Sequence, residues 1–251
     1  MLSVPGPEAT SPTPPRGSYV TFSLLRYGRG TRLWAFGRMG LWPRALAAVP
    51  GLRFGRLLGV GRGLAFSLRP DFGRYALLCA WADAGAAQAF LQSGLPAEAR
   101  ARGAQVGTYH LRALQARGSW GAAQPFEAEA AGPPAAGAPI AALTHARLRL
   151  RHLPAFWGAA RASARHLEQA PGLVFSVGMG ETPLTELATF SLWASAEQMK
   201  AYAYGGAPHK AAIAQKRAQG WYASELFARF ELLGAEGLPV PEGFQAGSQP
   251  F

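Results

Sequence analysis

The sequence predicts an α+β protein in which two fused ferredoxin-like (βαββαβ) halves form a dimeric-α/β-barrel-like unit. The order strand, helix, strand, strand, helix, strand occurs twice along the chain. The two copies also align without a gap, because residues 18–28 match 139–149 and residues 50–59 match 171–180, a constant offset of 121. One βαββαβ sheet leaves a face uncovered, and two such sheets can cover each other. The rival arrangement, two beads with separate cores, is disfavoured because halves this short bury little surface alone.

The later elements of each half are placed by matching tryptophans and helix caps. One strand ends at Trp81 in the first half and another at Trp193 in the second, and Asp83 and Ser195 are suitable helix N-caps. Matching the final strands through their arginines pairs Arg112 with Arg229. The predicted domains are a disordered tail (1–17), the first half (19–118), an exposed Pro- and Gly-rich linker (119–138), the second half (139–234) and a second tail (235–251).

The second half departs from the symmetry in one helical segment. Gly205-Gly206 ends one helix, and Pro208 is suited to begin another, so that His209 falls in its first turn. The positive end of the helix dipole favours neutral imidazole there, which is the form that binds a metal. A loop insertion that merely carries a histidine is the alternative. Lys216 and Arg217 share the face of His209, and residues 221–233 are predicted to form the last strand.

Composition limits the class of protein. No apolar run is long enough to cross a bilayer, and the N-terminal stretch lacks the hydrophobic region of a signal peptide, so we expect a cytoplasmic protein. Cys79 is the only cysteine, which excludes an intramolecular disulfide. The formal net charge is +11, and ten arginines but one acid, Asp71, occur between Arg26 and Arg74. This segment is either a peripheral docking surface for anionic lipid or a solvated arginine face. No nucleic-acid-binding signature accompanies it.

Several other side chains are candidates for a site. Glu225 is either a buried proton carrier or the partner of a cation such as Arg229, which lies on the same strand face. Trp193, Trp221 and Tyr222 either line a pocket for a long apolar ligand or belong to the core. Of the remaining histidines, His110 and His145 fall in predicted strands and His152 and His166 on an exposed helix, and no pair has zinc-site spacing.

Three stretches resemble a known family: RYGRGTRLWAFGRMG, then PGLRFGRLLGVGRGLAFSLRPDFGRYALLCAW, and finally MKAYAYGGAPHKAAIAQKRAQGWYASELFARF. They are similar to the spheroidene monooxygenases, the acyclic carotenoid 2-ketolases of purple phototrophic bacteria. The likeness spans about residues 19 to 234, and HKAAIAQKRAQGWYASELFARF is its most specific part.

The resemblance implies a haem-dependent enzyme that introduces a keto group at C-2 of an acyclic carotenoid such as spheroidene. O2 and a reduced ferredoxin-like donor would be its other partners. Related α+β barrels bind haem against a histidine on a helix of one half, so the resemblance implies haem b on His209, with Lys216 and Arg217 beside the propionates. The alternatives are a cofactor-free monooxygenase of the same barrel class and a non-enzymatic module that binds a hydrophobic ligand.

Overall fold

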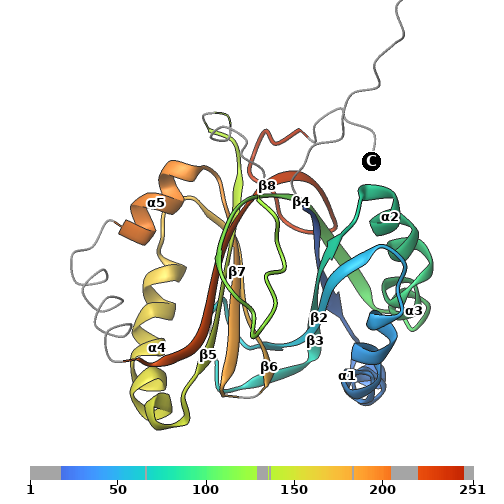
Figure 1. The fold of residues 1–251 in the computed structure, drawn as a ribbon, viewed down its shortest axis with the longest axis horizontal. Coiled ribbons are helices and arrows are strands. Elements are labelled where there is room, and N and C mark those ends of the chain that lie inside the picture. The colour runs from blue at the N-terminus through green and yellow to red at the C-terminus, as the bar shows by residue number, and fades with distance from the viewer. Residues whose placement is uncertain are drawn as a thin grey trace, which may run out of the picture.

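A computed structural model describes residues 18–65, 67–128, 135, 137–182, 184–204 and 220–245. Eight antiparallel strands form one closed barrel in the order β1-β3-β2-β6-β7-β5-β8-β4. Figure 1 shows α1, α2 and α3 on one side of the strands and α4 and α5 on the other. The predicted fold class is therefore confirmed, and each half contributes four neighbouring strands to the barrel.

The element order is that of two βαββαβ units. The first half contains β1 (Tyr19–Arg26), α1 (Arg32–Ala47), β2 (Leu52–Gly61), β3 (Pro70–Trp81), α2 (Ala84–Ser93), α3 (Leu95–Ala101) and β4 (Gln105–Gly118). The second half contains β5 (Ile140–Leu148), α4 (Leu153–Glu168), β6 (Leu173–Thr182), β7 (Glu186–Trp193), α5 (Ala196–Tyr204) and β8 (Tyr222–Glu236).

Strand register confirms that Trp81 and Trp193 are equivalent. Trp81 lies opposite Tyr19 in the ladder between β1 and β3, and Trp193 lies opposite Ile140 in the ladder between β5 and β7. Tyr19 and Ile140 are themselves separated by the same 121 positions that relate the two aligned first strands. Both tryptophans are fully buried on the helix-covered side of the barrel.

The predicted match of Arg112 with Arg229 is wrong by two residues. Tyr19 lies opposite Arg112, whereas its counterpart Ile140 lies opposite Glu231. A shift of two positions keeps every side chain on its original face of a strand, so alternation alone could not detect the error. Arg112 and Glu231 are instead direct partners across the seam between β4 and β8, where the Arg112 Nε donates to a Glu231 oxygen at 2.9 Å.

One shared interior holds the two halves together. Inward-facing side chains from both sheets form a continuous apolar cluster. At its centre Phe22 of β1 stacks on Phe190 of β7, with ring centroids 4.0 Å apart, and Tyr109 and Phe175 pack around them. This contact between the halves excludes the two-bead arrangement.

The predicted exposed linker is partly a core element. Trp120 and Phe126 are only 2% and 6% exposed, and both pack against Phe54 inside the barrel. Burial of two large aromatic rings outweighs the exposure that the surrounding Pro, Gly and Ala favour. This part of the linker therefore closes one end of the barrel.

The predicted C-terminal tail also needs correction. β8 continues to Glu236, and Leu238 and Phe244 pack against the barrel interior. The Tyr109 hydroxyl donates to the Pro239 carbonyl at 2.5 Å. Residues 235–245 are thus part of the folded unit.

Candidate functional site

The outer face of the first half is sealed by large apolar side chains. Leu25, Leu57 and Leu77 are at most 4% exposed and form one cluster with residues of α1, among them Trp42 and Leu46. This face of the first half is therefore occupied by one buried apolar cluster.

The same face of the second half carries much smaller side chains. Strand register makes Ala146 the counterpart of Leu25, Gly178 that of Leu57, and Thr189 that of Leu77. Three leucines of the first half are thus replaced by alanine, glycine and threonine at equivalent positions. We call this surface of β5, β6 and β7 the small-residue floor; it comprises Ala142, Thr144, Ala146, Gly178, Thr189 and Ser191.

The small-residue floor lies between two apolar clusters, and Ala142 packs against the first of them. At one end Trp193 packs with Met199, and its ring lies 5.0 Å from that of Tyr202. At the other end Trp221 packs with Phe156 and stacks on the His152 ring at 5.5 Å. Between these ends, five of the six floor residues are only half-buried, in contrast to the continuous cluster of the first half.

The predicted pocket residues therefore do not meet in one place. Trp193 pairs opposite Ile140 at the start of β5, whereas Tyr222 pairs opposite Leu148 at its end. Eight residues of extended strand span on the order of 26 Å. Trp193 on one side and Trp221 with Tyr222 on the other bracket the floor instead of lining a common wall.

Glu225 borders the small-residue floor from β8. It pairs opposite Ala146, and Phe227 pairs opposite Thr144. Glu225 is half-buried on the outer side of the barrel, and Phe227 is 39% exposed. Glu225 is thus at the edge of the floor, outside the barrel interior.

His209, Lys216 and Arg217 lie outside the described residues. The segment 205–219 that carries them connects α5 to Gly220. α5 packs at the Trp193 end of the floor, and the chain resumes at the Trp221 end.

The floor offers hydroxyl groups as its polar chemistry. The Thr144 and Thr189 hydroxyls hydrogen-bond each other at 2.5 Å, and the Ser191 hydroxyl accepts from the Trp193 indole at 2.9 Å. Among the described residues no group of three His, Cys, Asp or Glu side chains is arranged to hold a metal ion. A ligand on this floor would meet a mostly apolar surface whose hydroxyls are already paired.

The other four histidines lie in different parts of the barrel and its helices. His110 and His145 lie in strands, as predicted, and both are buried; His110 hydrogen-bonds the Tyr19 hydroxyl at 2.8 Å. His166 is exposed on α4, as predicted, and stacks on Tyr202. His152 lies in the short 3₁₀ helix Leu150–His152 before α4 and is half-buried, whereas the prediction was an exposed helical position.

A polar cluster inside the barrel was not predicted. His145 faces the interior, stacks on Trp120 at 3.9 Å, and lies with Nε2 3.2 Å from a Glu186 oxygen. Burial lowers the pKa of His145 to about 4, with Arg56 and Arg147 acting in the same direction and Glu181 against it. The neutral ring donates from Nε2 to Glu186, and its buried Nδ1 has no hydrogen-bond partner among the described residues.

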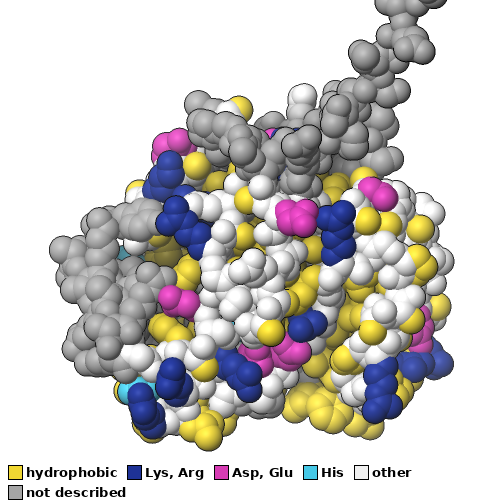
Figure 2. All heavy atoms as spheres, in the orientation of Figure 1, with side chains coloured by type: hydrophobic (Ala, Val, Ile, Leu, Met, Phe, Trp, Pro, Cys, Tyr) yellow, Lys and Arg dark blue, Asp and Glu magenta, His cyan; other side chains and the backbone are white. Residues whose placement is uncertain are grey.

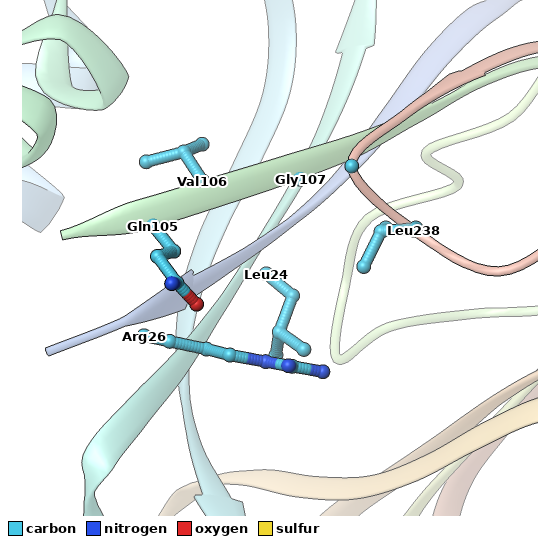
Figure 3. A pocket seen from close by; sticks show the side chains of 7 residues that line it. Leu24, Arg26, Gln105, Val106, Gly107 and Leu238 are labelled. Carbon is cyan, nitrogen blue, oxygen red and sulfur yellow. The ribbon is translucent and has the colours of Figure 1, made fainter.

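One cavity is lined by none of the small-residue floor. It measures about 290 Å³ and is formed by β1, β4 and the segment after β8. Figure 3 shows Gln105 extending toward Arg26, with Leu24 beside the Arg26 side chain and Leu238 farther along the pocket. None of the residues that line it is a predicted site residue.

Comparison with known proteins identifies the relatives of this chain. It is 35% identical over 220 residues to a spheroidene monooxygenase of Rhodobacter capsulatus, covering 87% of this chain and 91% of the relative. The chain belongs to the spheroidene monooxygenase family. A second member, from Rubrivivax gelatinosus, is 34% identical over 241 residues and is covered over 92% of its length.

Solved structures confirm the fold of this spheroidene monooxygenase family member. An aldoxime dehydratase in complex with butyraldoxime is similar with a TM-score of 0.56 and 12% identity, covering 86% of this chain and 79% of that one. A second aldoxime dehydratase structure gives a TM-score of 0.54 at 14% identity. No family model matches the chain.

Proposed function

We propose that this protein is a haem-dependent monooxygenase that introduces a keto group at C-2 of an acyclic carotenoid such as spheroidene. The observation that carries the proposal is the small-residue floor, which exists in one half of a duplicated barrel. Family membership supports the carotenoid substrate and O2, since relatives that cover most of the chain carry the name spheroidene monooxygenase.

The floor fits a flat, largely apolar group such as haem b. Ala146, Gly178 and Thr189 stand where the first half has three leucines, so this face of the sheet carries less side-chain volume than its counterpart. The aromatic clusters around Trp193 and Trp221 supply apolar contacts at either end. On this proposal His209 would hold the haem iron, and Lys216 and Arg217 would pair with the propionates.

A bound cofactor is needed because the substrate offers no acidic proton. The described floor provides paired hydroxyls, and its bordering carboxylate, Glu225, is too weak a base to remove hydrogen from a saturated carbon. When bound, haem supplies activated oxygen for such a C–H bond. A reduced ferredoxin-like protein is the proposed electron donor. The residues of the chain position the ring, exclude water through the aromatic ends and hold the hydrocarbon.

Refilling the floor tests the proposed site. The Thr189→Leu variant installs the residue that the first half has at Leu77, and overpacking costs about 1–3 kcal/mol. We expect haem affinity, measured from the Soret band, to fall by at least about tenfold, with a parallel loss of spheroidene ketolation. The reverse exchange, Leu77→Thr, is the matched control, because it lowers stability by about 2–4 kcal/mol without changing haem affinity.

The axial ligand is tested separately. His209→Ala should lose the Soret band and the ketolation activity, whereas His166→Ala should keep both. Added imidazole should restore part of the His209→Ala spectrum by filling the vacated position. A wild-type spectrum in either Thr189→Leu or His209→Ala would contradict the proposed site, and a colourless protein that converts spheroidene would contradict the haem.

A further inference from the structure

The outward face of α1 exposes large apolar side chains. Leu33, Phe36 and Leu41 are 88%, 56% and 57% exposed, while the inward face of the same helix buries Trp42 and Leu46. Gly37 and Gly40 lie on the same outward stripe, and a Cβ at either would meet open space. α1 is thus apolar on both faces, and one of them has no cover from the described protein.

The β2–β3 hairpin extends this apolar face. Phe72, at the start of β3, is 52% exposed, and its ring lies 5.6 Å from that of Phe36 in an edge-to-face arrangement. Figure 2 shows hydrophobic side chains gathered at the lower right, where α1 lies, with Lys and Arg side chains beside them. We call Leu33, Phe36, Leu41 and Phe72 the α1 patch.

Arginines flank the α1 patch at both ends. Arg29 and Arg32 are exposed at the N-terminal end of α1, and Arg44 is exposed near its C-terminal end. The acidic groups nearby are already engaged: Asp71 accepts from Arg74 at 2.8 Å, and Glu98 accepts from Arg38 at 2.5 Å. The surface therefore combines exposed apolar side chains with a net positive rim.

We propose that the α1 patch, with Arg29, Arg32 and Arg44, docks onto an anionic lipid bilayer. Lipid offers both required partners at once, since acyl chains accept leucine and phenylalanine while headgroup phosphates and carboxylates accept arginine. A second copy of the chain is disfavoured as the occupant, because a two-fold contact through this patch would bring the arginine rims together.

The docking is peripheral. α1 has 16 residues, and no helix among the described residues is long and apolar enough to cross a bilayer. The helix therefore lies along the interface with its outward stripe in the boundary between headgroups and acyl chains. This inference stands independently of the proposed haem chemistry, although a membrane-dissolved substrate would benefit from it.

Vesicle binding by the full chain tests the proposal. We expect the wild-type protein to sediment with phosphatidylcholine vesicles that contain phosphatidylserine, and to do so weakly with phosphatidylcholine alone. Replacing the exposed apolar groups (L33S/F36S/L41S) or two rim arginines (R29Q/R44Q) should each weaken binding by at least about tenfold. The matched control is L150S/R165Q, which changes an exposed leucine and arginine of the second half and should bind as wild type.

Two further measurements decide between lipid and a second copy of the chain: the depth of residue 36 in the bilayer, and the self-association of the protein. A Phe36→Trp variant compared with the parent protein should gain fluorescence that brominated acyl chains quench, whereas Leu150→Trp should gain fluorescence that they do not quench. Wild-type protein that ignores anionic vesicles, or a triple variant that binds as well as wild type, overturns the proposal. A wild-type dimer that becomes monomeric in L33S/F36S/L41S, without vesicle binding, would assign the patch to a second copy instead.

Discussion

Acidification should destabilise this barrel through His145, and a His145→Gln variant should show a weaker dependence on pH. The ring of His145 is fully buried between Trp120 and the carboxylate of Glu186. Glutamine keeps a donor for Glu186 but cannot take up a proton. The variant therefore separates the titration of this group from its packing.

The magnitude follows from the pKa of His145. Burial, reinforced by Arg56 and Arg147, lowers this pKa from 6.5 to about 4 in the folded protein. In the unfolded chain His145 is therefore protonated as the pH falls through 6.5, whereas in the folded protein it is protonated only near pH 4. The free energy of unfolding is therefore unaffected by His145 above pH 6.5 and decreases as the pH falls below that value. Below pH 4 the decrease reaches about 3 kcal/mol.

Urea unfolding at a series of pH values from 7 to 4.5 measures the effect. His145→Gln should be less stable than wild type at pH 7 because it loses the stacking on Trp120, and the difference should shrink by about 2–3 kcal/mol at the acid end. Other groups titrate alike in both proteins and cancel in the comparison. The exposed His166→Gln variant is the control and should follow wild type throughout. Parallel stability curves for wild type and His145→Gln would refute the reasoning.

Two further predictions concern the end of β4 and the start of the linker. Trp120→Ala should lower the free energy of unfolding by about 3–5 kcal/mol, whereas Leu150→Ala on the surface should change it by less than about 0.5 kcal/mol; equal effects in urea titrations would mean that Trp120 is not a core residue. Gly118→Ala should be severely destabilising, because Gly118 has a φ of +90° and a Cβ would lie 2.0 Å from the Glu225 carbonyl oxygen. Gly121→Ala, at a φ of +62° in open space, should cost only about 1 kcal/mol by thermal unfolding, and a similar loss in both would contradict the steric argument.

The duplicated fold could be predicted because two periodic signals agreed. Alternating apolar residues marked the strands, and the constant offset between halves fixed which strands correspond. The register of the last strand was predicted wrongly. Matching Arg112 to Arg229 kept the alternation of side chains but shifted the register by two residues. The ladder between β4 and β8 has a bulge on either side of Arg112. Bulges change the register locally, so the sequence pattern does not identify the residue opposite Arg112.

The candidate site was only partly visible in the sequence. The alignment of the halves already paired Leu25 with Ala146 and Leu57 with Gly178, so the loss of side-chain volume in the second half was present as a signal. The distance between Trp193 and Tyr222 could not be predicted from the sequence. It depends on strand pairing, which places Trp193 opposite the start of β5 and Tyr222 opposite its end. In the linker, composition suggested exposure, and the two aromatic residues Trp120 and Phe126 were the contrary evidence.

The two seams between the halves are unequal, and this gives the barrel a preferred place to open. The ladder between β4 and β8 runs from Thr108 to Gly118, whereas that between β2 and β6 holds only two residue pairs, Gly59 with Gly180 and Val60 with Met179. At this short seam an ion pair of 3.3 Å joins Arg56 to Glu181, and Trp120 from the linker donates to the same carboxylate at 3.1 Å. Local unfolding should therefore begin between β2 and β6. The linker connects the two halves in sequence, and its Trp120 also binds Glu181 at the short seam. Closure of the barrel at this seam therefore depends on Trp120, Arg56 and Glu181.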